Sequence, residues 1–330
     1  MATKQFSLAE AFDPSLPATI LIEGEDAPTA FTPAVNPNYR FRRELLRAFV
    51  MFWKSADTAL YLNGHKGTGK STLVQQFHAR LNLPLLTVCA HRNMEMADLL
   101  GHFVMRPDAS MAFHYGPLSK AAKEGWSVLL DEANALDPGV FLGLHALLEG
   151  ASIYLPETEE VIVPRRGFRV FVACNPNDHS GVYQGRNTQD AATHDRFWFV
   201  TVPYASPGEE IPLVDQELAR AGNWDEQQRR TLAGGMVEVA NKIRALFAGS
   251  SDAANAITVT MTTRTLLRWA KAMLLCKDAD RMGLSPVHEA LKVAFTNGPI
   301  EPETRIALHD IVTQVFGVAD PSEPDAAKAR

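Results

Sequence analysis

The segment Gly64–Ser71 constrains the fold of this chain more than any other feature of its sequence. It reads Gly-His-Lys-Gly-Thr-Gly-Lys-Ser and matches the pattern G-x-x-x-x-G-K-[ST] at every fixed position. The apolar run Ala59–Leu62 precedes it, and an amphipathic pattern follows from Thr72 to Leu81. A strand, a glycine-rich turn and a helix in this order form a loop whose amides and helix N-terminus hold phosphate groups. The sequence therefore predicts a nucleotide-binding loop inside an α/β domain.

Four more apolar runs follow in the first two-thirds of the chain and alternate with helical or irregular stretches. Short, nearly continuous apolar strands of this kind are typical of a parallel sheet that is covered on both faces. We therefore expect an α/β fold with a doubly wound parallel sheet of five strands. The expected strands are Ala59–Leu62, Pro84–Val88, Ser127–Leu130, Phe168–Ala173 and Phe197–Val202.

The chain changes character after about residue 205. Strand-like runs stop and apolar residues recur with a helical period, which predicts a small all-helical domain over residues 206–317. Ahead of the α/β domain (37–205), residues 1–36 are rich in Pro, Ala, Thr and Asp and predict an extended arm or linker. Residues 318–330 predict a disordered tail. The expected helices are Arg42–Trp53 and, in the second domain, Asp225–Phe247, Thr263–Cys276, Pro286–Ala294 and Pro302–Val315.

Composition excludes several classes of protein. With 330 residues, 46% of them hydrophobic and 21% charged, the chain has the profile of a globular protein with two domains. No stretch approaches the roughly 20 apolar residues of a membrane-spanning helix, and no secretory signal pattern is present. Three cysteines are too few for a disulfide framework. The net charge of -6 argues against broad binding of nucleic acid. We expect a cytoplasmic protein without a membrane partner, and the acidic balance favours a protein client over nucleic acid.

The residue types of the loop predict its ligands. The glycines let the backbone curl toward the β-phosphate, Lys70 is expected to reach the β- and γ-phosphates, and Ser71 is expected to ligate Mg²⁺. ATP and Mg²⁺ are therefore the expected cofactors, with Ser71 and Asp131 as the metal ligands. The predicted nucleotide-binding residues are Gly64, His65, Lys66, Gly67, Thr68, Gly69, Lys70, Ser71, Thr72 and Asp131.

Polar residues at the ends of two expected strands predict a hydrolytic site. The strand that begins at Ser127 ends in Asp131 and Glu132. Asp131 is placed to hold the water shell of Mg²⁺, and Glu132 is placed to polarise the attacking water. Asn175 follows another buried strand and is interpreted as a polar sensor that orients the water, although it can also cap the turn into Pro176. We expect Glu132 and Asn175 to be catalytic.

Phosphoryl transfer also needs positive charge at the developing transition state. Arg196 directly precedes the last expected strand, and Arg264 opens a helix of the second domain. A lone arginine is more often part of a surface or structural ion pair. Their positions, however, match a known pattern.

The ordered set of phosphate loop, Asp131-Glu132, Asn175, Arg196 and Arg264 resembles an AAA+ ATPase. Within that superfamily the chain resembles the MoxR branch, and it is similar to the ATPase subunits of aerobic cobaltochelatases. The resemblance covers most of the chain. The segments that carry it are Val35–Tyr39, Gly64–Thr72, Asp98–Gly101, Gly116–Leu118, Gly181–Tyr183, Asp195–Phe197 and Thr263–Ala270.

The resemblance implies roles for the two arginines. Arg196 would be an arginine finger that reaches the γ-phosphate bound by the neighbouring subunit, with Arg186 as the rival for this role. Arg264 would be the second sensor, coupling the nucleotide to a helical lid. A finger in trans implies a ring, usually a hexamer, and the family implies a partner with a metal-ion-adhesion (VWA-type) domain.

The client of such a motor is left open among three classes: a tetrapyrrole metal chelatase, another metalloenzyme or assembly activated by a MoxR-type chaperone, and nucleic acid moved by a translocase or nuclease motor. A ring that binds ATP without hydrolysing it is the non-enzymatic alternative. The presence of both Glu132 and Arg196 argues against it.

Two insertions are typical of the branch. Alternating residues predict β-hairpins over Leu99–Phe113 and Ser152–Arg166. By resemblance they face the central pore or the partner, and the alternative is a surface hairpin with no contact role. Ten histidines invite a search for a metal site, but none stands at ligand spacing from Cys, Asp or another His. Mg²⁺ is the only metal expected.

Overall fold

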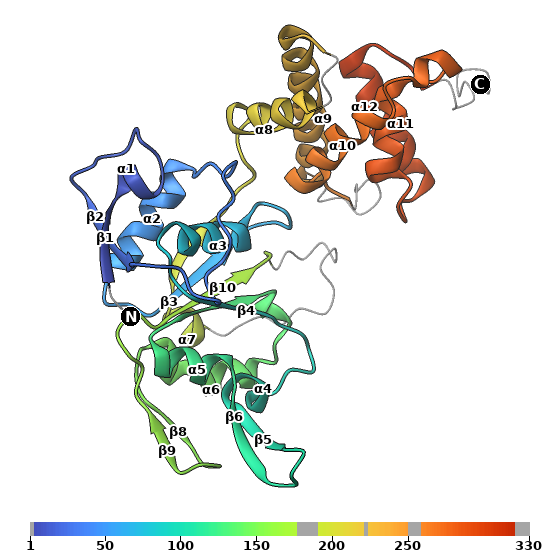
Figure 1. Ribbon diagram of the computed structural model, residues 1–330. Helices are drawn as coiled ribbons and strands as arrows, with labels where there is room; N and C mark the ends of the chain where they lie inside the picture. Colours follow the sequence, from blue (N-terminus) through green and yellow to red (C-terminus); the bar gives the residue numbers. More distant parts are fainter. Residues whose placement is uncertain (1–2, 177–190, 221–223, 250–258, 321–330) are drawn as a thin grey trace. The chain divides into compact units, whose positions relative to one another are not determined.

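The computed structural model describes residues 3–176, 191–220, 224–249 and 259–320 (Figure 1). The chain divides into two compact units, residues 1–203 and residues 204–330. In the described part of the chain, every helix is too short or too polar to cross a membrane.

The first unit is built on a parallel sheet of five strands in the order β11-β3-β10-β7-β4 (Figure 1). All five expected strands are confirmed, with small changes at their ends. The strands are Ala59–Asn63 (β3), Leu85–Cys89 (β4), Ser127–Asp131 (β7), Arg169–Cys174 (β10) and Trp198–Thr201 (β11). Because β10 lies between β3 and β7, Cys174 pairs with Asn63 and Ala173 pairs with Asp131. This register places the residues that follow the three strands at one edge of the sheet.

Helices cover both faces of the sheet, because successive residues of each strand point to opposite sides. Side chains of α2 and α3 pack with Leu60, Leu62 and Phe171 on one face. Side chains of α5 and α6 pack with Val128 and Val172 on the other. The helices of this unit besides the N-terminal one are Arg43–Lys54 (α2), Lys70–Arg80 (α3), Met96–Leu100 (α4), Pro117–Glu124 (α5), Pro138–Leu148 (α6) and Ala191–His194 (α7), with a 3₁₀ turn at Ala133–Ala135.

The N-terminal residues differ from the expected extended arm. Thr3–Ser7 (β1) and Leu21–Glu25 (β2) form an antiparallel hairpin around the short helix Leu8–Ala11 (α1). Its apolar side chains join the core under α2 and α3, where the rings of Phe12 and Phe77 stack at 5.4 Å. The prediction of an arm is therefore corrected over residues 3–25. The short apolar runs become ordered only through burial against the helices, which local sequence does not reveal.

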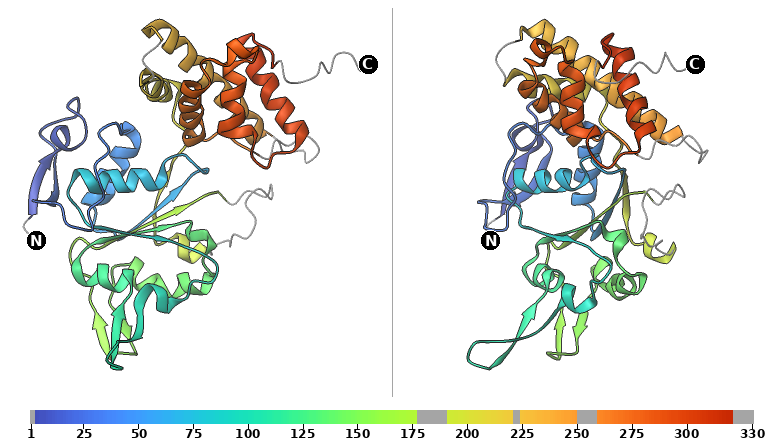
Figure 2. Two further views of the ribbon diagram at one scale, coloured as in Figure 1. Left: turned by 45° about the vertical axis from the view of Figure 1, so that its right-hand side comes forward. Right: turned by 90° about the vertical axis from the view of Figure 1, so that its right-hand side faces the viewer.

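Both expected hairpins are confirmed. Gly101–Met105 (β5) pairs with Met111–Tyr115 (β6), and Ile153–Leu155 (β8) pairs with Glu160–Ile162 (β9). They lie side by side and project from the same end of the unit (Figure 2). Glu160 accepts hydrogen bonds from Tyr115 Oη at 2.5 Å and from Lys123 Nζ at 2.8 Å, which ties the second hairpin to the first and to α5.

The second unit is all helical, and its four expected helices are confirmed. The helix α8 was not expected. Ser206 and Glu209 form its capping box and Pro207 occupies the first turn, but Pro212 lies inside the helix and interrupts the helical pattern. The core contains Trp269 and Leu308 at 0% exposure. The elements are Pro207–Ala219 (α8), Glu226–Gly249 (α9), Thr263–Leu275 (α10), Ala279–Met282 (3₁₀), Pro286–Leu291 (α11), Lys292–Thr296 (π-helix) and Pro302–Phe316 (α12).

The expected disordered tail needs a correction at its start. Asp320 is only 8% exposed and pairs with Lys292 at 2.8 Å, so residues 318–320 continue the folded unit. The buried contact is made by a residue far along the chain, which a compositional argument cannot detect. Residues 321–330 lie outside the described residues.

Candidate nucleotide site

Glycine is required where the chain leaves β3 and enters α3. A Cβ atom on Gly64 would lie 2.2 Å from the carbonyl oxygen of Val202, a distance that no side chain tolerates. Gly67 and Gly69 have φ of 78° and 90°, a region that glycine adopts without strain. Gly69 is the N-cap of α3, which is 11 residues long. The segment therefore curls around the positive end of a helix, as a phosphate-binding loop must.

Lys70 holds its ammonium group inside this curl. Its Nζ donates to the carbonyl oxygens of Gly64 at 2.6 Å and His65 at 3.1 Å, and to Oδ1 of Asn175 at 2.8 Å. The residue is only 7% exposed. A buried ammonium group needs such partners, and each is an oxygen that a phosphate oxygen can replace. Lys70 thus offers a desolvated cation at the mouth of the loop.

Two oxygen atoms suited to a hard cation meet beside the loop. Ser71 Oγ donates to Asp131 Oδ2 at 2.6 Å, and the backbone N–H of Glu132 donates to Asp131 Oδ1 at 3.0 Å. Mg²⁺ prefers oxygen ligands and is commonly held by one carboxylate together with phosphate oxygens. The hydroxyl and carboxylate present therefore fit this ion.

Asn175 connects the cation to the second carboxylate. Its Oδ1 accepts from Lys70, while its Nδ2 donates to Glu132 Oε2 at 2.9 Å and Oε1 at 3.1 Å. Asn134 Nδ2 donates to the backbone oxygen of Asn175 at 3.2 Å and anchors it. Glu132 has a φ of 54°, a strained conformation that costs about 1–3 kcal/mol and is concentrated at functional sites. The arrangement places a polarised carboxylate, an amide and an ammonium group in one chain of contacts.

The structure brings Lys70, Ser71, Asp131, Glu132 and Asn175 together. The remaining loop residues surround them: Thr68 is buried and bonds to His65 O at 3.0 Å, Lys66 is exposed, and Thr72 is half-buried on α3.

Arg196 is not part of this cluster, and Arg264 belongs to the second unit. The Nε of half-exposed Arg196 pairs with Glu149 Oε1 at 2.8 Å, at the C-terminal end of α6. Arg264 is exposed in the first turn of α10, in the other unit. Arg186 lies outside the described residues, as does the Gly181–Tyr183 segment.

One supporting residue escaped the sequence argument. Arg42 donates from Nη2 to the backbone oxygen of Thr68 at 3.0 Å and from Nη1 to that of Pro203 at 2.7 Å. It therefore ties the loop to the end of the α/β unit. Arg42 stands in the cluster Arg40, Arg42 and Arg43, and no local signal distinguishes it from its neighbours.

Cys174, next to Asn175, offers no nucleophile. Burial raises the pKa of its thiol to about 11, so the group stays protonated at neutral pH.

In the helical unit a buried ion pair lies beside Arg264. Arg244 of α9 donates from Nη1 and Nη2 to the two carboxylate oxygens of Glu210 of α8, at 2.6 and 2.9 Å. Thr263 Oγ1, in the first turn of α10, donates to Glu210 Oε1 at 2.6 Å. Glu210 thus joins three helices and anchors the residue that precedes Arg264. No local sequence pattern indicates this set, because its members are widely separated along the chain.

Comparison with known families decides the class of protein. Residues 59–197 match the AAA domain family (dynein-related subfamily), over the segment that contains the phosphate loop, Asp131, Glu132, Asn175 and Arg196. This chain is an AAA+ ATPase. Residues 225–315 match the CbbQ/NirQ/NorQ C-terminal family, and this second match contains Arg264. Together the two matches confirm the expected resemblance to the MoxR branch.

Several curated proteins resemble this ATPase over most of their length. It is 28% identical over 297 residues to aerobic cobaltochelatase subunit CobS of a Sinorhizobium species, and the aligned region covers 88% of this chain and 84% of the relative. It is 27% identical over 262 residues to protein NorQ of Paracoccus denitrificans, with coverage of 79% and 87%. It is 27% identical over 290 residues to denitrification regulatory protein NirQ of Stutzerimonas stutzeri, with coverage of 88% and 95%.

Proposed function

We propose that this AAA+ ATPase works as a ring, a hexamer, and uses ATP hydrolysis to remodel or activate a partner protein complex. The observation that supports the hydrolytic part is the chain of contacts in which Asn175 joins Lys70 to Glu132. A cation for phosphate, a carboxylate for water and an amide between them are the groups that phosphoryl transfer to water needs.

The proposed mechanism assigns one task to each residue. Lys70 binds the β- and γ-phosphates, and Ser71 and Asp131 hold Mg²⁺, which neutralises phosphate charge when bound. Asn175 turns from Glu132 toward the water and the γ-phosphate. The water oxygen forms a bond to the γ-phosphorus as the bond from that phosphorus to the β,γ-bridging oxygen breaks. The water proton passes to the carboxylate of Glu132. The products are ADP and phosphate.

Arg196 is proposed to complete the site of the neighbouring subunit. Its ion pair with Glu149 lies outside the cluster of its own subunit, which is what an arginine acting in trans requires. Arg264, at the start of α10, is proposed to sense the nucleotide from the helical lid. An arginine finger contributes about 10³–10⁵ to the rate of hydrolysis.

Mixing two inactive variants tests the ring and the finger together. Arg196→Ala and Glu132→Gln each abolish turnover alone while ATP still binds. In a mixed ring, a site with Glu132 intact can lie next to a subunit with Arg196 intact. We expect ATPase activity to reappear on mixing. The assignment of Arg196 is wrong if mixing restores no ATPase activity. It is also wrong if Arg196→Ala hydrolyses ATP normally while Arg186→Ala is inactive.

The client is proposed to be a metalloenzyme or its assembly, reached through a partner with a metal-ion-adhesion domain. Two classes are compatible with the relatives, a cobalt chelatase as for CobS and an enzyme activated as for NorQ or NirQ. The match of residues 225–315 to the CbbQ/NirQ/NorQ family favours the second class. Exposed apolar residues on the two hairpins, Met105, Met111, Tyr154 and Val161, support a docking role for them.

Reconstitution with the proteins encoded beside this one distinguishes the two client classes. Cobalt insertion into a tetrapyrrole that depends on ATP supports the chelatase. ATP-dependent gain of activity by another metalloenzyme, with no tetrapyrrole bound to the complex, supports the activator. If neither occurs and hydrolysis does not respond to the partner, the remodelling function is wrong.

A further inference from the structure

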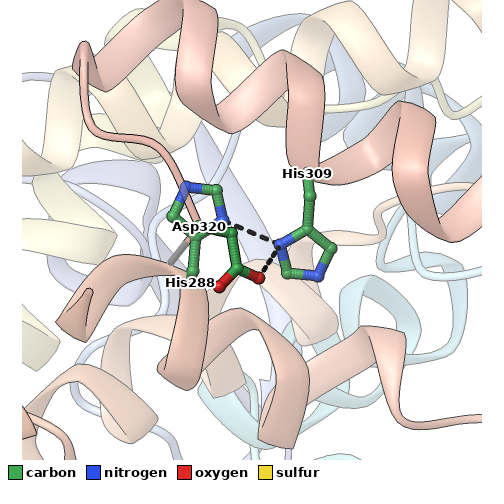
Figure 3. A group of neighbouring side chains, drawn as sticks. All are labelled: His288, His309 and Asp320. Carbon is green, nitrogen blue, oxygen red and sulfur yellow. Dashed lines mark hydrogen bonds and ion pairs between the residues drawn. The ribbon is translucent and has the colours of Figure 1, made fainter. Parts of the chain in front are cut away.

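Three side chains of the helical unit converge in its interior (Figure 3). His288 lies on α11, His309 lies on α12 and Asp320 follows α12. They are 0%, 1% and 8% exposed, and one potential ligand atom from each lies within 4.8 Å of the others. The expectation that no histidine is paired at ligand spacing is thereby corrected, because helix packing brings together residues that are far apart in sequence. The hydrolytic site uses none of the three.

The hydrogen bonds around the two rings define which nitrogen atoms point inward. His288 Nε2 lies 2.8 Å from the backbone oxygen of Val318, and since a carbonyl only accepts, this nitrogen carries the hydrogen. His309 Nε2 lies 3.0 Å from Thr296 Oγ1, a hydroxyl that can accept. The two Nδ1 atoms therefore face each other inside the cluster, 2.7 Å apart (Figure 3). The hydrogen bond between them uses one ring hydrogen, which a bound metal ion displaces.

We propose that His288, His309 and Asp320 bind a divalent transition-metal ion of the Zn²⁺ class through the two Nδ1 atoms and a carboxylate oxygen. Neutral imidazole and carboxylate are ligands that Zn²⁺ accepts in tetrahedral sites, and water supplies the fourth position. Asp320 Oδ2 already lies 3.5 Å from His309 Nδ1. Two nitrogen atoms bound to one tetrahedral ion lie about 3.3 Å apart, so the rings must separate by roughly 0.6 Å.

Outer contacts of the kind that metal ligands require are present for all three residues. A ligating histidine almost always donates its other nitrogen to a carbonyl, carboxylate or water, and ligating carboxylates are themselves hydrogen-bonded. Here Val318 and Thr296 serve the two histidines, and Lys292 Nζ contacts Asp320 at 2.8 and 3.1 Å. Thr296 ends a π-helical segment, a feature frequent at functional sites.

The surrounding charge accommodates the ion. Lys292 repels a cation, but Glu289 Oε1 lies 2.9 Å from its Nζ. The two carboxylates, Asp320 and Glu289, balance the positive charges of Lys292 and of Arg305, which also acts on His309, so no net positive charge opposes the ion. The ion links α11 and α12 to the segment that contains Asp320 and thereby fastens the C-terminal end of the helical unit.

Metal binding by full-length protein without an affinity tag tests the proposal. After chelator treatment, the protein is dialysed against Zn²⁺ or Co²⁺ without nucleotide, and the metal content and the visible Co²⁺ spectrum are measured. We expect one ion per chain, a tetrahedral Co²⁺ spectrum and a higher Tm with Zn²⁺. His309→Ala is expected to lose about 100-fold or more in affinity, and Thr296→Val about 10–100-fold.

His114→Ala is the matched control, because exposed His114 faces His102 across the β5–β6 hairpin and forms the obvious rival pair. It is expected to bind Zn²⁺ as the unaltered chain does. Thr296→Val keeps the shape of the side chain, so it remains informative if His309→Ala fails to fold. No stoichiometric ion on the unaltered chain, unchanged affinity in Thr296→Val, or loss of the ion in His114→Ala would each overturn the proposal.

Discussion

Replacing Glu210 by Gln removes the carboxylate that accepts two hydrogen bonds from the Arg244 guanidinium. Glu210 is 0% exposed and Arg244 is 7% exposed. The guanidinium donates twice to this carboxylate, once from Nε to the backbone oxygen of Met261 at 2.7 Å, and once from Nη1 to Asn241 Oδ1 at 3.2 Å. It also lies 4.3 Å from the ring centroid of Tyr204. Glu210→Gln keeps the shape but leaves a buried charge without its counter-charge.

Such an uncompensated buried charge costs about 3–5 kcal/mol. For a unit of this size, each kcal/mol lowers Tm by about 3–5 °C, so we expect the Tm of the helical unit to fall by roughly 9–25 °C. Thr263 also loses its tie to Glu210, so the start of α10 at Arg264 becomes less stable. Calorimetry measures the first effect. Hydrogen exchange measures the second, as faster exchange in α8, α9 and α10 with β3 and β10 unchanged.

Two controls make this prediction refutable. Glu217→Gln removes an ion pair with exposed Arg220, which is worth less than about 1 kcal/mol, so Tm should fall by no more than a few degrees. Replacing both partners together, Glu210→Leu with Arg244→Met, should recover most of the loss, because apolar pairs substitute for buried ion pairs at little cost. If Glu210→Gln lowers Tm no more than Glu217→Gln does, the reasoning about the buried pair is wrong.

Three further predictions concern the α/β unit. Lys70→Met should abolish ATP binding measured by calorimetry. Glu132→Gln should instead lower kcat by about 10²–10⁴-fold and leave the Kd for ATP unchanged. A kcat of Glu132→Gln within tenfold of normal contradicts the role of Glu132 as base. Gly64→Ala should lose nucleotide affinity and Tm together, because its Cβ meets a backbone oxygen at 2.2 Å, and normal binding would exclude this steric argument. At pH 8 a thiol reagent should label exposed Cys89 before Cys174. The buried thiol of Cys174 has a pKa of about 11 and becomes reactive only as pH rises toward that value. Equal labelling rates of the two cysteines, followed by mass spectrometry, would refute this.

Local patterns predicted the phosphate loop, the five strands, and Asp131, Glu132 and Asn175 as the polar residues beside the loop. The loop depends on glycines at fixed spacing and on a strand and helix beside it, all within about twenty residues. Asp131 ends the buried strand β7 and Asn175 follows β10, and parallel strands present their carboxyl ends at one edge of the sheet. The strand order then places them beside Lys70, so a local reading was enough to name them.

Other features had no local signal. The N-terminal hairpin folds because Phe6 and Ile22 find an apolar surface on α2 and α3. Arg42 supports the loop through two backbone oxygens that are far from it in sequence. In both cases the stabilising contact exists only after the helices and the sheet have packed.

The sequence by itself determined that this chain is a nucleotide-binding α/β protein with a helical second unit, because glycine geometry, strand alternation and helical periodicity are local properties of the chain. The tertiary structure alone decided which polar residues meet in the interior of the helical unit. Glu210 joins Arg244 and Thr263, and His288 joins His309, through the packing of helices whose partners are 34, 53 and 21 residues away in sequence. Burial makes these contacts obligatory, since a polar group removed from water must find its partner within the fold.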